Sequence, residues 1–266
     1  FRPGRVKNGS INMNEDYFTA LEQFVASADS LSSSDYYRND LCEMMAHYLG
    51  GKSEILIKQI DQEYMLGDTV QAQFLRKRFE TLMLGMDIML RHHPNLRLDR
   101  WVNFASSHGH NAVQKKLYET NAKRIVPVWG PPVDDYSARI WSGLVKDYYL
   151  ERWKRYFDAR ESGKSIDLAA WEVAWVEQDW QQPMEPEPLD VVDFSRRMLA
   201  LSKDIAACDV VLNRPDLLAT WSLTAHEGKV IEMTVSASIV SQLKGISLNC
   251  LRGEGLEAEG FELVAD

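Results

Sequence analysis

Apolar residues recur at intervals of three and four from about Asp16 to Asp204, and the pattern breaks at Gly, Pro or Asn. This spacing is typical of amphipathic helices, because about 3.6 residues make one turn. We therefore predict a mainly α fold, a bundle of six to eight helices over residues 16–204. The expected borders divide the chain into residues 1–15, 16–204 and 205–266.

Glycines set several of the expected helix ends. Asp35 can cap a helix that stops at Gly50-Gly51, because Asp accepts hydrogen bonds at helix starts and Gly favours helix ends. The stretch from Ile55 to Leu90 predicts one long helix or a pair hinged near Gly67.

The aromatic-rich segment after Val126 predicts a central helix. Asp134 or Asp135 stands where a helix cap is expected, and apolar residues follow on two adjacent stripes. Such a wide apolar face is typical of a helix that packs between neighbours. The stripes consist of Ile140, Leu144 and Tyr148 and of Trp141, Val145, Tyr149 and Trp153.

After Asp204 the pattern changes from helical to alternating. The stretch TWSLTAHEGKVIEMTVSASIV alternates apolar and polar residues around a Glu227-Gly228 turn, which is typical of paired β-strands. Residues 205–266 are therefore predicted to form an all-β, sandwich-like segment. Because this length is roughly half of the ~100 residues of a usual sandwich, we expect a unit that is incomplete or ordered only in part.

The composition is that of an acidic globular protein. Of the 266 residues 45% are hydrophobic, and the formal net charge is -9. Nucleic-acid surfaces are built from clustered Lys and Arg, so no nucleic acid is expected as a partner. No apolar run approaches the roughly 20 residues of a membrane helix, and no membrane span is expected. Since the chain starts at Phe1 without an initiator methionine, we expect a fragment or a mature product.

Residues with catalytic or metal-binding potential are few. His92-His93 and His108-Gly109-His110 lack the ligand spacing of zinc sites, so we expect loop histidines, no metal and no other cofactor. Glu177 and Asp179 lie in a polar, proline-rich stretch where nothing would desolvate them, and no catalytic carboxylates are expected in this chain. The disulfide state of the three widely spaced cysteines stays open; they are Cys42, Cys208 and Cys250.

Trp129 lies in an unusual turn, VPVWGPPVDDY, that starts at Val126. The flanking prolines fix backbone angles and supply few N–H groups, so they hold an aromatic ring rigidly at low entropic cost. A pre-organised ring suits the flat apolar face of a sugar. The alternative interpretation is a ring that closes the end of the bundle, and the pattern alone leaves both open.

Four motifs occur in a specific order. They are YYRNDL, LRLDRW, YETNAKRIVPVWG and DDYSARIWSGLVKDYYLERW, starting at Tyr36, Leu96, Tyr118 and Asp134. With these motifs the chain resembles the C-terminal helical domain of the alpha-N-acetylglucosaminidases, glycoside hydrolase family 89. The resemblance covers about residues 18–203.

The resemblance implies a function for a larger protein. In that family a preceding TIM barrel carries two catalytic glutamates that remove terminal α-linked N-acetylglucosamine from glycans with retention. It implies that residues 1–15 link to such a barrel, and that Trp129, Tyr136 and Val133 contribute a substrate-binding wall. It also implies a secreted or periplasmic protein in bacteria, and a lysosomal one in animal relatives.

Two hypotheses from different classes therefore remain. The chain is either the C-terminal part of a retaining exo-glycosidase, inactive by itself, or a free-standing helical scaffold or carbohydrate-binding module without catalysis. A longer reading frame that carries a barrel with two glutamates would distinguish them.

Overall fold

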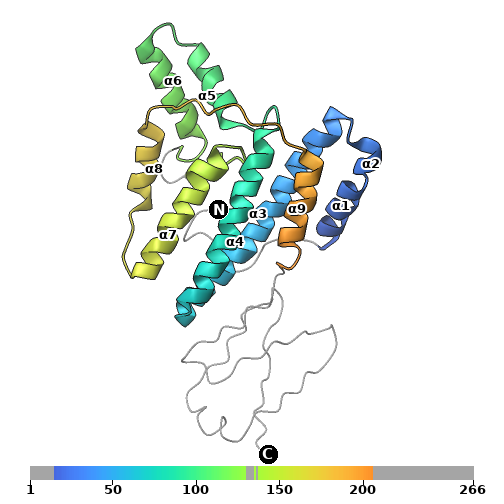
Figure 1. Cartoon of the computed structure of the whole chain (residues 1–266). Coiled ribbons are helices and arrows are strands. Elements are labelled where there is room, and N and C mark those ends of the chain that lie inside the picture. The colour runs from blue at the N-terminus through green and yellow to red at the C-terminus, as the bar shows by residue number, and fades with distance from the viewer. Residues whose placement is uncertain (1–14, 130–134, 136, 206–266) are drawn as a thin grey trace, which may run out of the picture. The chain divides into compact units, whose positions relative to one another are not determined.

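A computed structural model of the chain describes residues 15–129, 135 and 137–205 (Figure 1). Within these ranges nine α-helices and one π-helix, η1, are present, which confirms the mainly helical prediction and exceeds the expected number by at least one. The expected β-rich segment lies outside the described residues except for Ile205, and the linker 1–15 lies outside them except for the first residue of α1. The helices are α1 (Glu15–Ala26), α2 (Ala28–Leu31), α3 (Asp35–Leu66), α4 (Thr69–Arg91), α5 (Leu98–Ser107), α6 (Ala112–Ile125), η1 (Val145–Leu150), α7 (Glu151–Ser162), α8 (Leu168–Glu177) and α9 (Val191–Ser202).

The two longest helices, α3 and α4, form an antiparallel pair at the centre of the helical unit (Figure 1). The predicted stop at Gly50-Gly51 is wrong, since α3 continues through both glycines to Leu66. Buried residues surround the glycines on α3, and this packing outweighs the weak helix propensity of glycine. The predicted hinge is confirmed at Gly67, which adopts the left-handed φ of 78°, and Asp68 then caps α4.

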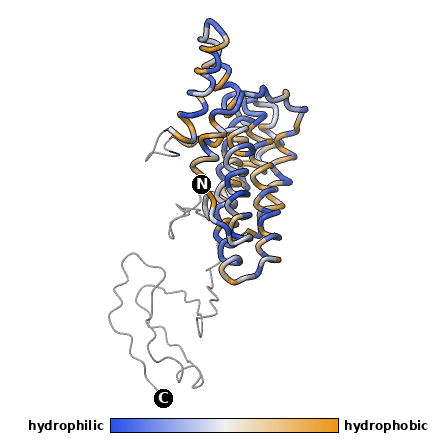
Figure 2. Tube along the Cα trace, turned by 90° about the vertical axis from the view of Figure 1, so that its left-hand side faces the viewer, coloured by the Kyte–Doolittle hydropathy of each residue, from blue (hydrophilic) through white to orange (hydrophobic). Residues whose placement is uncertain are grey.

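A continuous hydrophobic core lies between α3, α4 and α7. Phe79 of α4 meets Trp153 and Phe157 of α7 at ring-centroid distances of 6.5 and 5.8 Å. Figure 2 shows hydrophobic and hydrophilic positions alternating along the helices, which is the arrangement that the sequence period predicted. Burying each such large side chain contributes about 1.5 to 3 kcal/mol.

The start of the central helix differs from the prediction. The helix begins beside Leu144, so Asp135 does not cap it, and Asp134 lies outside the described residues. The cap comes from α4, where the Asp87 carboxylate accepts hydrogen bonds from the backbone N–H groups of Gly143 at 2.7 Å and Lys146 at 3.1 Å. Burial raises the pKa of Asp87, and these N–H groups oppose that rise.

The segment before this helix is not helical. Its Ser142 forms a parallel bridge with Arg97, the one isolated bridge within the described residues. Ile140 and Trp141 are therefore outside the helix and half-buried. The predicted buried face of the helix itself is confirmed, because the other five stripe residues are 3% exposed or less: Leu144, Val145, Tyr148, Tyr149 and Trp153.

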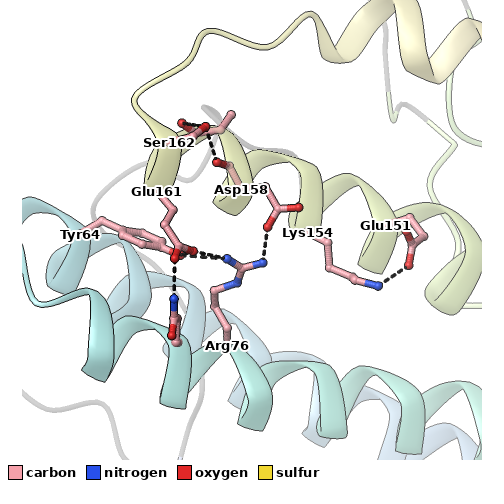
Figure 3. Close-up of polar contacts among 9 residues, drawn as sticks. Tyr64, Arg76, Glu151, Lys154, Asp158, Glu161 and Ser162 are labelled. Atoms are coloured by element: carbon pink, nitrogen blue, oxygen red, sulfur yellow. Dashed lines mark hydrogen bonds and ion pairs between the residues drawn. The ribbon is translucent and has the colours of Figure 1, made fainter.

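A polar network joins α7 to α3 and α4 (Figure 3). Arg76 donates to Asp158 at 2.6 Å and to Glu161 at 2.9 Å, and it also donates to the hydroxyl of Tyr64 at 3.1 Å. Hydrogen bonds to a charged guanidinium are stronger than neutral ones, so this network fixes the C-terminal half of α7 against the central pair.

Helices α5 and α6 form a hairpin at one end of the helical unit (Figure 1). The Trp101 indole of α5 donates to the carbonyl of Ala122 at 2.8 Å, which holds α6 against α5. The buried ammonium of Lys123 donates to the carbonyl of Gln178 just beyond α8. Burial, together with nearby Lys116, lowers the pKa of Lys123 to about 8. These contacts place the C-terminal end of α6, from which the Trp129 turn continues.

Candidate functional site

Trp129 lies on a tight turn directly after α6. The backbone N–H groups of Val128 and Trp129 both donate to the carbonyl of Arg124, at 3.1 and 2.7 Å. Trp129 adopts a φ of 41°, which is rare for a bulky side chain and costs about 1 to 3 kcal/mol. Such strain persists only where the surroundings hold the residue in place.

Trp129 differs in exposure from its neighbours on the turn. Val126 and Val128 are buried, whereas 47% of Trp129 is exposed. Val133 and Tyr136, the two other residues of the expected substrate-binding wall, lie outside the described residues. The structure thus places an exposed indole on a strained turn, and the wall formed by three residues stays a prediction.

A buried arginine lies behind the turn. The side chain of Arg152 on α7 is 0% exposed, and one of its nitrogens, Nη1, lies 3.0 Å from Asp135 Oδ1 and 3.0 Å from Glu172 Oε1. The rings of Tyr148 and Tyr149 lie 4.9 and 5.5 Å from the guanidinium carbon. Burial opposes the charged form, but hydrogen bonding and the negative charges raise the pKa of Arg152 above its usual value.

Asp135 links this cluster to the turn. Its φ is 59°, in the left-handed region that Asp and Asn tolerate better than most residues. Its backbone N–H donates to the carbonyl of Pro127 at 2.9 Å, two residues before Trp129. Asp135 therefore contacts both the buried arginine and the strained turn.

This cluster was not predicted, although the sequence contains a signal for it. Arg152 follows Tyr148 by four residues and so falls on an apolar stripe, and Glu172 interrupts the apolar run LAAWEVAWV. Single charges at buried helix positions are almost always paired. The pattern could have indicated an ion pair, but it contains no information on which residues form it.

A hollow of about 450 Å³ lies between α4, η1, α7 and α8. Trp171 and Trp175 form part of its wall. The ring of Tyr148 stacks on Trp171 at 5.4 Å, and the guanidinium of Arg155 lies 5.1 Å from the same indole. These indoles thus have packing partners within the chain, as expected for core aromatics.

The other candidate residues occupy structural or exposed positions. His93 Nδ1 accepts hydrogen bonds from the backbone of Asn95 and Leu96, so this histidine stabilises the turn after α4. The carboxylates of Glu177 and Asp179 are exposed, and Asp179 pairs with Lys116. Across the described residues, no three His, Cys, Asp or Glu side chains could hold a metal ion together, and no helix is long and apolar enough to cross a membrane.

The protein-family model that describes the alpha-N-acetylglucosaminidase (NAGLU) C-terminal domain matches residues 5–201 of the chain. The matched region contains the nine α-helices of the described residues, except the last residue of α9, together with Trp129 and Arg152. The chain belongs to this family. The resemblance inferred from the four sequence motifs is confirmed.

Three known proteins are similar to parts of this chain. Human alpha-N-acetylglucosaminidase is 26% identical over 170 residues, which are 59% of this chain and 22% of the human protein. A family 89 glycoside hydrolase from Clostridium perfringens, solved with PUGNAc, is similar in structure with a TM-score of 0.64 at 23% identity, over 69% of this chain and 23% of that one. CpGH89 from the same organism, solved with its substrate GlcNAc-alpha-1,4-galactose, gives a TM-score of 0.62 at 24% identity, over 68% and 23%.

Each of these matches covers only a small part of the relative. The chain spans less than a quarter of the length of each relative. At such identities the structural likeness establishes the helical fold, whereas activity belongs to the larger relatives.

Proposed function

We propose that this chain is the C-terminal part of a retaining exo-glycosidase that removes terminal α-linked N-acetylglucosamine from glycans. A TIM barrel preceding it in the same protein carries the two catalytic glutamates, and the helical domain supports that barrel. The observation that carries the proposal is the family match over residues 5–201. The same proposal includes a secreted, periplasmic or lysosomal location for the intact protein.

Within this proposal Trp129, Val133 and Tyr136 form an aromatic and aliphatic wall of the sugar pocket. The support for Trp129 is its exposure of 47% on a backbone with a φ of 41°. A ring that is already fixed loses little conformational entropy on binding, so its contact with a sugar face contributes to affinity and orientation.

The exposed apolar side chains of the α5–α6 hairpin support docking of a further domain. Phe104, Val113 and Leu117 are 62%, 79% and 53% exposed. Val113 and Leu117 are four residues apart on α6 and so share one face of that helix, and exposed apolar side chains on one face are typical of surfaces that another protein domain covers. The relatives have more than three quarters of their length outside the matched region, which is ample for a barrel.

The catalytic carboxylates are assigned to the barrel because the buried carboxylates of the described residues already have other roles. Asp87 caps a helix, Asp99 pairs with Arg97, and Glu172 pairs with Arg152. A retaining site needs two carboxyl groups about 5 Å apart that face the substrate. The 266-residue chain alone is therefore expected to have no glycosidase activity.

An assay of the intact protein beside this chain tests the proposal. With p-nitrophenyl α-N-acetylglucosaminide the intact protein should release nitrophenol, and proton NMR should show the α-anomer of the sugar first. The chain alone should do neither, and the β-linked substrate serves as the control. An inactive intact protein that still binds N-acetylglucosamine would favour a carbohydrate-binding module, and turnover by the chain alone would contradict the division of roles.

A further inference from the structure

We infer that Asp135 is a positioning residue: it ties the strained turn that presents Trp129 to the buried guanidinium of Arg152. Its effect on substrate binding rests on the proposed function, whereas its effect on the position of Trp129 does not. Asp135 contacts no substrate in this account and acts only through Trp129.

Asp135 makes one contact on each side. On the turn side, its backbone N–H donates to the carbonyl of Pro127 at 2.9 Å. On the core side, its carboxylate accepts from Arg152 Nη1 at 3.0 Å. A displacement of Asp135 away from Arg152 would therefore pull on Pro127, and Trp129 is two residues further along the chain.

The guanidinium of Arg152, which binds Asp135, is itself held in a fixed position. Arg152 lies on α7 with a side chain that is 0% exposed, and Glu172 on α8 accepts from the same nitrogen at 3.0 Å. The guanidinium also lies over the rings of Tyr148 and Tyr149. Contacts from two helices and two rings restrict the guanidinium of Arg152. Asp135, which is bound to this guanidinium, is therefore restricted as well.

The backbone at both ends of the turn requires such a tie. Trp129 and Asp135 are the two residues other than glycine with positive φ in the described part of the chain, at 41° and 59°. A bulky residue leaves this region of φ readily when nothing holds it there. The Asp135–Arg152 ion pair is buried on the arginine side and largely buried on the aspartate side, with side-chain exposures of 0% and 15%, so solvent screens it less than a surface pair.

The test compares Asp135→Asn with Glu172→Gln. Each substitution neutralises one of the two carboxylates beside the guanidinium of Arg152. The other carboxylate still compensates the buried positive charge, so both variants should fold. Asn tolerates the left-handed conformation as Asp does and keeps the N–H that donates to Pro127. The amide oxygen of the first variant can still accept from Arg152, but the charge of the ion pair is lost, so this variant weakens the tie to the turn. The second variant leaves the hydrogen bond between Asp135 and Arg152 in place.

The first readout is the environment of Trp129 in the 266-residue chain. With 5-fluorotryptophan incorporated, fluorine NMR should resolve the eight tryptophans, and Trp129→Phe assigns the relevant resonance. In Asp135→Asn this resonance should broaden or move toward its position in the urea-unfolded chain, while Glu172→Gln leaves it in place. An unchanged resonance in Asp135→Asn, equal changes in both variants, or a loss of native helical circular dichroism in Asp135→Asn overturns the inference.

The second readout is the kinetics of the intact protein. Asp135→Asn should raise KM for an aryl α-N-acetylglucosaminide about tenfold with kcat within about twofold, because a displaced wall weakens binding, and Glu172→Gln should leave KM within about twofold. If the resonance of Trp129 changes but KM does not, the positioning role stands and the pocket role of Trp129 fails. If neither changes, the positioning role fails.

Discussion

The carboxylate of Asp87 lies 2.7 Å from the backbone nitrogen of Gly143, although 56 residues separate the two in the chain. This contact caps the helix that begins beside Leu144 with a side chain from a neighbouring helix. The start of the central helix thus depends on tertiary packing and not on a local capping residue.

Removal of this cap should destabilise the helical domain. Asp87→Ala leaves the N–H groups of Gly143 and Lys146 without their acceptor, and we expect the free energy of unfolding to fall by about 2 to 4 kcal/mol. Asp87→Asn keeps an acceptor oxygen in place and should lose about 1 kcal/mol. Urea unfolding of both variants measures the difference, and equal losses would show that the carboxylate is not a cap.

His93 should make stability depend on pH. Burial lowers the pKa of His93 from its ordinary value of 6.5, against the charges of Glu43 and Asp40, which raise it. The folded chain therefore favours neutral His93. The stability that neutral His93 contributes is fully present above pH 6.5, and it is lost as the pH falls through the lower pKa of the folded state. A proton on Nδ1 would also remove the acceptor for the N–H groups of Asn95 and Leu96.

The matched variant for this prediction is His93→Asn. An amide oxygen can accept the same hydrogen bonds and does not titrate in this range. Melting temperatures between pH 7 and pH 5 should fall less steeply for the variant than for the original chain. Parallel curves would rule out His93 as the source of the acid sensitivity.

Cys42 should be chemically inert in the folded chain. Burial raises the pKa of its thiol to about 12, so on the order of one molecule in ten thousand carries the thiolate at pH 8. In a Cys208→Ser, Cys250→Ser background, iodoacetamide should modify Cys42 only after addition of denaturant, as measured by mass spectrometry. Modification of the native chain at the rate of an exposed thiol would contradict the buried position.

Local pattern predicted the helical segments of the fold because each helix buries one face. It also predicted the break at Gly67, where the left-handed φ of 78° suits glycine. The predicted stop at Gly50-Gly51 failed because packing on both sides of the glycines compensates their low helix propensity. A helix end that is capped by a residue distant in the sequence, as Asp87 caps the helix that begins beside Leu144, cannot be predicted from local spacing.

The candidate site was predictable to a smaller extent. The prolines and glycine around Trp129 indicated a stiff turn, and the structure adds that Trp129 itself has a strained φ. The roles of Asp135 and Arg152 depend on a contact across 17 residues, which local spacing cannot indicate. The β-rich segment, Val133 and Tyr136 stay predictions.

The most direct test of the account is the substitution Trp129→Ala, measured both in this chain and in the intact protein. Because Trp129 is 47% exposed, the chain should lose less than about 1 kcal/mol, whereas the control Trp153→Ala, at a side chain 2% exposed, should lose about 3 to 5 kcal/mol. In the intact protein Trp129→Ala should lower kcat/KM for the aryl α-N-acetylglucosaminide about 100-fold. A loss of stability as large as that of Trp153→Ala, together with unchanged kcat/KM, would show that Trp129 closes the helical domain and does not line the sugar pocket.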